Sequence, residues 1–158
     1  MPDWQLAQIN VARLLQPEGS PEVAEFFSRL DEINALAEAS EGFVWRLQES
    51  EGGNATGLAV SPDPNLIVNM SVWRDVDALH DFAYRSAHAP VMAKRRQWFS
   101  RHVGAYQALW WIECTRRPTI EEGLSKLWLL DRFGPSERAF GFKSRFPPPA
   151  AAALANRP

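Results

Sequence analysis

The sequence is poor in cysteine and contains no long apolar run. Cys114 is the only cysteine in 158 residues, which excludes an internal disulfide and any zinc site built from several cysteines. No apolar stretch approaches the roughly 18 residues of a membrane-spanning helix, and no charged leader precedes an apolar segment at the N-terminus. We therefore expect a cytoplasmic protein.

An excess of charge of one sign is also missing. Seventeen lysines and arginines nearly balance 19 aspartates and glutamates, and the net charge of −2 gives no electrostatic basis for binding nucleic acid or an acidic membrane. Glycine-rich phosphate loops, closely spaced histidine pairs and the Gly-x-Ser-x-Gly motif do not occur. A nucleotide cofactor, a closed metal site and a serine-hydrolase mechanism are therefore not predicted, and we expect no resident cofactor.

The chain is instead rich in apolar residues, which make up 46% of it and include seven tryptophans. This composition is typical of a globular protein, and the length suggests one domain. We expect that domain over residues 1–146, followed by a proline- and alanine-rich tail over residues 147–158. Several tryptophans around one cavity would form an aromatic pocket.

Four segments have the apolar patterns of β-strands. Trp4 to Arg13 alternates, with small and branched apolar residues on one side and Leu6, Gln8 and Asn10 on the other. The other predicted strands are Phe43 to Glu49, Leu66 to Trp73 and Tyr106 to Cys114.

Helix signals lie between and after these strands. Ser20-Pro21 is typical of a helix start, and Asp75 is an expected N-cap after the third strand. A second helical segment is expected from His88 to His102. The apolar stripe of the first helix has helical spacing and consists of Val23, Phe26, Phe27, Leu30, Ile33 and Ala37.

The C-terminal part predicts one more helix and one more strand. Thr119 and Glu122 have the spacing of a capping box, and Phe140 and Phe142 suggest a short edge strand. The whole order is β-α-β-β-α-β with an extra helix and strand, which predicts an α+β fold of the ferredoxin-like, split βαβ type.

Helices are expected to cover one face of this sheet and to leave the other bare. That other face has a mixed polar and aromatic character. Its expected members are Gln8, Asn10, Arg46 or Trp45, Asn69, Ser71, Trp73 and Gln107 or Trp110. Such a face is too aromatic to remain in water, so we expect a second copy of the sheet to cover it. The result would be a homodimeric α/β barrel around a cavity for a small molecule.

His88 begins the face that indicates a functional site. Steps of three and four residues from it reach Val91, Met92, Arg95, Trp98, Phe99 and His102. A purely structural face would be apolar throughout, whereas this one holds two histidines and an arginine. His88 is expected to act as a base or a metal ligand, with a backbone hydrogen bond at the helix junction as the structural alternative. His80 and His102 are expected in solvent or at the dimer interface.

Five segments resemble the DUF3291 family of bacterial proteins, and together they cover Trp4 to Phe146. These segments are QINVARL, INALAEASEGFVWRLQ, LIVNMSVW, FAYRSAHAPVMAKRRQWF and ALWWIECTRRPTIEEG. The family is similar to the antibiotic-biosynthesis-monooxygenase group of the dimeric α/β barrel superfamily, which hosts many activities. The family pattern has a histidine before the proline that follows the Trp-Trp pair, where this sequence has Arg117.

The resemblance implies a small-molecule enzyme similar to cofactor-independent monooxygenases, acting on an aromatic or polyketide-like substrate. His88 would be the base, and Asn10 and Asn69 would hold the substrate enolate. The residues expected to contact the substrate are Trp73, Tyr84, Arg95, Trp98 and Trp110. The structural alternatives are cross-strand hydrogen bonds for the two asparagines and core packing for the tryptophans.

Two other classes of function stay open. Heme-degrading members of the superfamily bind iron through a histidine in the equivalent helix, so one alternative is a heme-binding or heme-modifying protein with His88 as axial ligand. The other is a ligand-binding dimer without catalysis. The absorption spectrum of the purified protein distinguishes the heme class from the rest.

Overall fold

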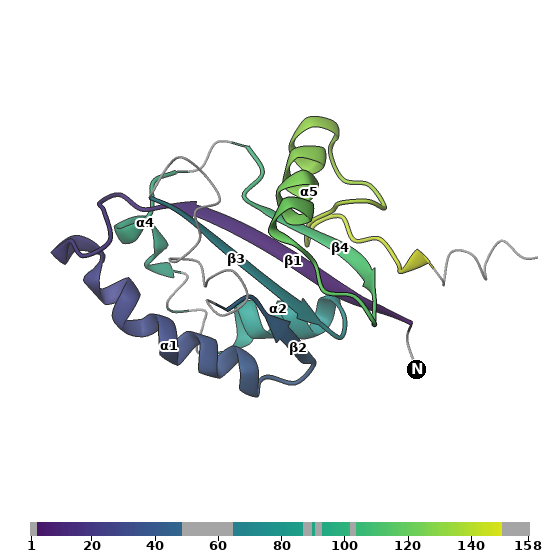
Figure 1. Cartoon of the computed structure of the whole chain (residues 1–158), viewed down its shortest axis with the longest axis horizontal. Helices are drawn as coiled ribbons and strands as arrows, with labels where there is room; N and C mark the ends of the chain where they lie inside the picture. The colour runs from purple at the N-terminus through teal and green to yellow at the C-terminus, as the bar shows by residue number, and fades with distance from the viewer. Residues whose placement is uncertain (1–2, 49–64, 87–89, 91–92, 102–103, 150–158) are drawn as a thin grey trace, which may run out of the picture.

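The computed structural model describes residues 3–48, 65–86, 90, 93–101 and 104–149 (Figure 1). Its elements are β1 (Trp4–Arg13), the 3-10 helix η1 (Pro21–Val23), α1 (Ala24–Ala39), β2 (Phe43–Arg46), β3 (Leu66–Trp73), α2 (Val76–Arg85), α4 (Arg95–Trp98), β4 (Gln107–Glu113) and α5 (Ile120–Phe133). The predicted bounds of β1 and β3 are confirmed, whereas β2 is shorter than predicted.

The four strands form one antiparallel sheet in the order β2-β3-β1-β4. β1 lies between β3 and β4, so that Asn10 pairs with Asn69 on one side and with Gln107 on the other. This strand order, with helices in the connections β1–β2 and β3–β4, is the predicted ferredoxin-like α+β arrangement.

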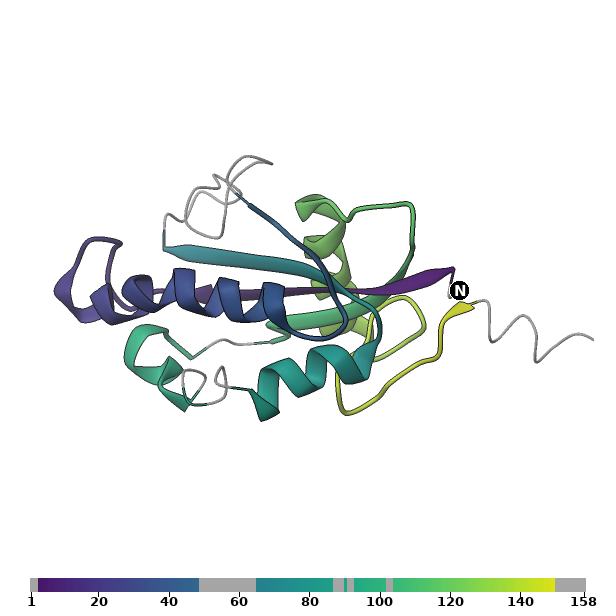
Figure 2. The same ribbon diagram turned by 90° about the horizontal axis from the view of Figure 1, so that it is seen from below.

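Helices cover both faces of the sheet, with α1, α2 and α4 on one side and α5 on the other (Figures 1 and 2). Successive residues of a strand point to opposite faces, so each strand contributes to both layers. The α5 face consists of Ala7, Ile9, Val68, Met70, Val72, Ala108, Trp110 and Ile112. The cavity face consists of Leu6, Gln8, Asn10, Ile67, Asn69, Ser71, Trp73 and Gln107.

The α5 face is a closely packed apolar layer. Ile9, Met70 and Trp110 are at most 1% exposed and pack with Leu127 of α5. α5 approaches the sheet closely because Gly123 has no side chain. A Cβ at this position would lie 2.6 Å from Ile9 Cδ1 and 2.9 Å from Met70 Sδ. The sequence therefore fixes the distance between helix and sheet with one glycine.

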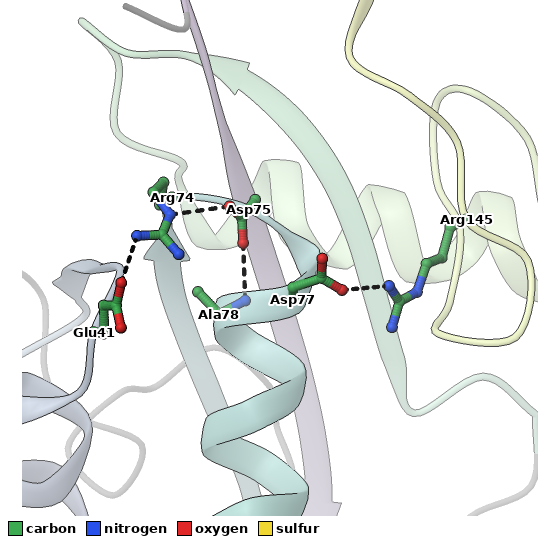
Figure 3. A network of polar contacts seen from close by, with 6 residues as sticks. All are labelled: Glu41, Arg74, Asp75, Asp77, Ala78 and Arg145. Carbon is green, nitrogen blue, oxygen red and sulfur yellow. Dashed lines mark hydrogen bonds and ion pairs between the residues drawn. The ribbon is translucent and has the colours of Figure 1, made fainter.

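A polar network fixes the N-terminus of α2 (Figure 3). Asp75 Oδ1 accepts a hydrogen bond of 2.8 Å from a backbone N–H of the first turn, which confirms the predicted N-cap. Arg74 contacts Asp75 at 3.0 Å and Glu41 at 3.2 Å, and Arg145 contacts Asp77 at 2.8 Å. The network connects α2 to the turn after α1 and to the C-terminal segment.

The capping box of α5 is half confirmed. Thr119 Oγ1 accepts a hydrogen bond of 3.1 Å from the backbone N–H of Glu122. The second hydrogen bond of a capping box, from the backbone N–H of Thr119 to the Glu122 carboxylate, is not formed. The carboxylate instead accepts hydrogen bonds from Arg116 at 3.0 Å and from Trp110 Nε1 at 3.3 Å. At the first helix, Ser20 makes no side-chain cap and Pro21 begins η1 rather than α1.

The segment after α5 returns to the free edge of β4. Phe140 and Leu109 exchange two backbone hydrogen bonds of 2.9 and 2.8 Å, and Trp111 Nε1 donates to the carbonyl of Phe146 at 2.8 Å. The predicted edge strand is therefore reduced to isolated bridges, at Phe140 and between Gly141 and Ser144. These contacts attach the end of the described chain to the sheet.

The expectation that the mixed face of the sheet is bare is wrong. Helices of the same chain cover it, because the apolar stripe of α1 and the inner side of α2 pack against Ile67 and Trp73. A second copy is not needed to cover this face. The homodimer itself stays a prediction, and it must use another surface.

The second predicted helical segment, His88 to His102, is confirmed in part. Pro90 and Ala93 are helical, a turn at Lys94 separates them from α4 at Arg95–Trp98, and Phe99 already pairs with Leu14 in an isolated bridge, so the segment ends earlier than predicted. His88 and His102 lie outside the described residues. Within the described part of the chain, no helix is long and apolar enough to cross a membrane.

Candidate small-molecule site

A cavity of about 210 Å³ lies between the cavity face and the helices α1, α2 and α4. The sheet supplies mainly its polar lining, and the helices supply mainly aromatic and aliphatic side chains. Its polar and aromatic lining includes Gln8, Asn10, Phe26, Phe43, Arg46, Asn69, Ser71, Trp73, Phe82, Tyr84, Arg95, Trp98, Tyr106, Gln107 and Phe142. These residues come from seven elements, from the residue before β4 and from the segment after α5.

Four side chains of β1 and β3 form a connected amide ladder on the cavity face. Gln8 Nε2 donates to Asn69 Oδ1 and to Ser71 Oγ, both at 2.9 Å. Asn10 Nδ2 donates to Gln8 Oε1 at 3.0 Å and to Asn69 Oδ1 at 3.3 Å. The register explains the ladder, since Gln8 pairs with Ser71 and Asn10 with Asn69. Gln8 is only 2% exposed, so these bonds are needed to satisfy it.

The ladder occupies the acceptors of Asn69 and Ser71 and leaves a donor on each of these two residues. Ser71 Oγ accepts from Gln8 and from Trp73 Nε1 at 2.8 Å, so its own hydrogen is its remaining capacity. Asn69 Oδ1 accepts two hydrogen bonds, and no described residue accepts from Asn69 Nδ2. Asn10 Oδ1 is an acceptor without a donor in the described part of the chain. The floor of the cavity thus offers N–H and O–H groups to an oxygen atom of a ligand.

Aromatic clusters lie at both ends of the ladder. At one end, the fully buried Trp73 stacks on Phe82 at 5.1 Å and meets the edge of Phe43 at 5.4 Å. At the other end, Phe26 contacts Trp98 at 5.8 Å, and Trp98 is 2% exposed. A flat apolar ligand therefore has ring surfaces to pack on at either side of the polar groups.

The described His80 belongs to the rim of the cavity rather than to its floor. Its ring lies 4.6 Å from the ring of Tyr84 and 5.3 Å from that of Phe142. Tyr84 and Phe142 line the cavity, and Tyr84 is 49% exposed. Tyr84 therefore lies between the cavity and solvent.

Two guanidinium groups of the described residues line the cavity. Arg46 Nε donates to Glu38 Oε1 at 2.7 Å, so its charge is balanced within the protein. Arg95 instead lies over the ring of Tyr106, with 4.7 Å between Cζ and the ring centroid. Beside it, Lys94 binds Glu25 at 2.9 Å and connects α4 to α1, and this hydrogen bond lowers the pKa of Glu25.

The structure brings together six of the eight residues predicted for the site. Those that line the cavity are Asn10, Asn69, Trp73, Tyr84, Arg95 and Trp98. Trp110 does not, because it belongs to the α5 face and donates to Glu122 on the far side of the sheet. His88 lies outside the described residues, so its role stays a prediction.

Sequence reasoning placed Gln8 and Ser71 on the mixed face but missed them as site residues. The signal was present, since a glutamine and a serine at alternating positions of two apolar strands must find partners when buried. Arg117, where the family pattern has a histidine, is exposed and donates to the carbonyl of Arg116 at 3.0 Å. It does not line the cavity. No group of three potential metal ligands occurs among the described residues.

The fold and the cavity define a ferredoxin-like α+β protein with an internal cavity of polar and aromatic lining. The chain belongs to the DUF3291 family, a domain of unknown function, whose model matches residues 5–156. This confirms the resemblance seen in the five sequence segments. Among curated proteins, none matches the chain.

Several solved structures are similar in fold. SnoaB from Streptomyces nogalater, described as a cofactor-independent oxygenase, is 20% identical with a TM-score of 0.47, covering 75% of this chain and 98% of SnoaB. A protein of unknown function from Nitrosomonas europaea is 14% identical with a TM-score of 0.46, covering 74% of this chain and 95% of its own. A Mycobacterium tuberculosis protein is 15% identical with a TM-score of 0.47, covering 73% and 99%. These similarities concern the fold and do not extend to function.

Proposed function

We propose that this protein is a small-molecule oxygenase that binds a phenol-bearing aromatic substrate in the cavity and oxidises it with O2, without a bound cofactor. The observation that carries the proposal is the pair of free donors, Asn69 Nδ2 and the Ser71 hydroxyl, at the floor of an aromatic cavity. Donors already in place around an oxygen atom favour its anionic form.

The donors would act on the phenol oxygen. Two hydrogen bonds from Asn69 and Ser71 favour the phenolate over the phenol and so lower the pKa of the bound substrate. Gln8 holds both donors in position through its two bonds of 2.9 Å, and Asn10 supports the Asn69 side chain. Asn10 is therefore a positioning residue in this proposal, which revises the expectation that both asparagines donate to the substrate.

The size of the cavity limits the substrate. An engineered protein cavity of about 150 Å³ holds one benzene molecule, so about 210 Å³ suits one or two fused rings. Trp73 and Trp98 would pack on the ring faces at the two ends. The proposed substrate is accordingly the aromatic one of the two classes expected from the sequence, an aromatic or a polyketide-like compound, and it has one or two rings.

The proposed reaction balances without a further reductant. The phenolate donates electrons from a ring carbon to O2, and a C–O bond forms at that carbon. Cleavage of the O–O bond then leaves one oxygen atom as a quinone carbonyl, while the other leaves as water with two hydrogen atoms of the substrate. The base that removes the phenol proton is predicted from the sequence to be His88, and its loss should slow the reaction by about 10²–10⁴-fold.

Oxygen uptake with one- and two-ring phenols, including 1-naphthol, tests the proposal. One O2 should be consumed per quinone, and labelled O2 should place one labelled atom in the quinone and one in water. Asn69→Ala should lower the turnover rate by roughly 10²-fold, as for the loss of one donor to a developing oxyanion. Asn65→Ala removes the same group from the residue before β3, outside the cavity, and should keep the wild-type rate. Absence of turnover by the wild type, or an unchanged rate in folded Asn69→Ala, would refute the proposal.

A further inference from the structure

Arg95 is a charged group without an anionic partner among the residues that the structure describes. It begins α4, lines the cavity and is half-buried, with its guanidinium over the ring of Tyr106. Within the described residues, no carboxylate lies within ion-pair distance of it. The neighbouring Lys94, by contrast, binds Glu25 at 2.9 Å, and the other guanidinium of the cavity, Arg46, binds Glu38 at 2.7 Å.

A half-buried cation needs compensation, because burial removes part of its hydration. The ring of Tyr106 supplies only part of it through the cation–π contact. The planar fork of an arginine matches a carboxylate with two parallel hydrogen bonds, which an ammonium group cannot reproduce. The missing partner of Arg95 is therefore best supplied by an anionic group of the ligand.

Arg95 and the amide ladder are close enough in the fold to act on one ligand. Tyr106, which lies under Arg95, precedes Gln107, and Gln107 is the β4 partner of Asn10. The carbonyl of Tyr106 also accepts a backbone hydrogen bond of 2.9 Å from Val11 on β1. The cation and the donors thus border the same part of a cavity of about 210 Å³.

We infer that the substrate is a hydroxyaromatic carboxylic acid of one or two rings, with its carboxylate on Arg95 and its hydroxyl group on Asn69 and Ser71. The inference rests on the proposed function, in that it takes the cavity to be the substrate site. The acid group supplies the anion that no described residue supplies at Arg95. The hydroxyl group meets the donors that the ladder leaves free. A neutral phenol fills the same space without satisfying Arg95.

Binding of three probes under anaerobic conditions tests this inference separately from turnover. The probes are 5-hydroxy-2-naphthoic acid, its methyl ester and 1-naphthol, and the readout is Kd by calorimetry. The wild type should bind the acid roughly tenfold to a hundredfold more tightly than the ester, the usual range for a hydrogen-bonded ion pair. Equal affinity for acid and ester, or no binding of the acid, overturns the inference.

Variants of Arg95 test whether this residue causes the preference for the acid over its methyl ester. Arg95→Gln should reduce the ratio of ester Kd to acid Kd to about one while leaving the Kd of 1-naphthol unchanged. Arg95→Lys keeps the charge but not the planar fork, so it should lower the ratio several-fold, and it carries the test where the glutamine variant does not fold. Arg96→Gln removes the adjacent, exposed charge of α4 and should keep the full ratio. A folded Arg95→Gln that retains the acid preference refutes the assignment.

The outcomes separate the two proposals. A protein that prefers the acid through Arg95 but consumes no O2 refutes the oxygenase and leaves the acid site intact. A protein that oxidises 1-naphthol and shows no acid preference refutes the acid site and leaves the oxygenase intact.

Discussion

The two faces of the sheet are built from the same strands and serve opposite purposes. On the α5 face, Ile9 and Met70 are buried to within 1% and a glycine lets the helix approach closely. The residues that alternate with them along β1 and β3, such as Gln8, Asn10 and Ser71, belong to the cavity face. There the covering helices leave about 210 Å³ unfilled. Alternation in a strand lets one sequence specify a packed layer and a binding layer at once. We expect stability to depend mainly on the first and ligand binding on the second.

The largest effect should come from truncation on the α5 face. Met70→Ala should lower the free energy of unfolding by about 2–5 kcal/mol, since it leaves a cavity under α5. Ile33→Ala, in the half-exposed wall of the existing cavity, should cost only about 1 kcal/mol. Urea denaturation of both variants measures the difference. Equal losses would mean that the two layers are packed alike.

A smaller effect is expected when the close approach of α5 is blocked. Gly123→Ala places a Cβ 2.6 Å from Ile9 Cδ1, and overpacking costs about 1–3 kcal/mol. The higher helix propensity of alanine returns about 1 kcal/mol, so the net loss should be about 0–2 kcal/mol by thermal or urea unfolding. Ser125→Ala, at an exposed position of the same helix, should instead be neutral or slightly stabilising. A Gly123→Ala protein more stable than the wild type would contradict the packed layer.

The smallest effect concerns the charge on α5. Burial lowers the pKa of Lys126 below 10.5, and Arg138 and Arg116 add to this while Glu122 opposes it. The unfolded chain then binds more protons between the lowered pKa and 10.5, so stability due to this group rises as pH increases through that window. Lys126→Met should be relatively more stable than the wild type at neutral pH, and the gap should narrow toward pH 10.5. Lys143→Met, which removes an exposed charge, controls for net charge, and a constant gap for Lys126→Met would contradict the prediction.

Short sequence patterns predicted most of the order of strands and helices along the chain. Alternation gave the bounds of β1 and β3, and Asp75 and Thr119 identified two helix starts through side chains that accept the first free N–H groups. These features depend on neighbours in sequence. The ferredoxin-like strand order followed from the order of elements.

The sequence could not indicate which helices cover which face. Trp110 and Trp111 are adjacent and equally aromatic, yet one packs beneath α5 and the other faces the C-terminal segment. That choice depends on contacts between residues distant in sequence, such as Gly123 against Ile9. The same limit explains why Trp110 was placed in the pocket and why the mixed face was expected to be bare.

The pairing of Phe140 with Leu109 affects the tendency of the protein to aggregate through the edge of its sheet. β4 is an outer strand, and without a neighbour it would present unpaired N–H and C=O groups to solvent. The returning segment occupies part of that edge through two backbone hydrogen bonds. It thereby shortens the stretch onto which a strand of another molecule could add, so that a chain ending before Phe140 would be more prone to aggregate through β4.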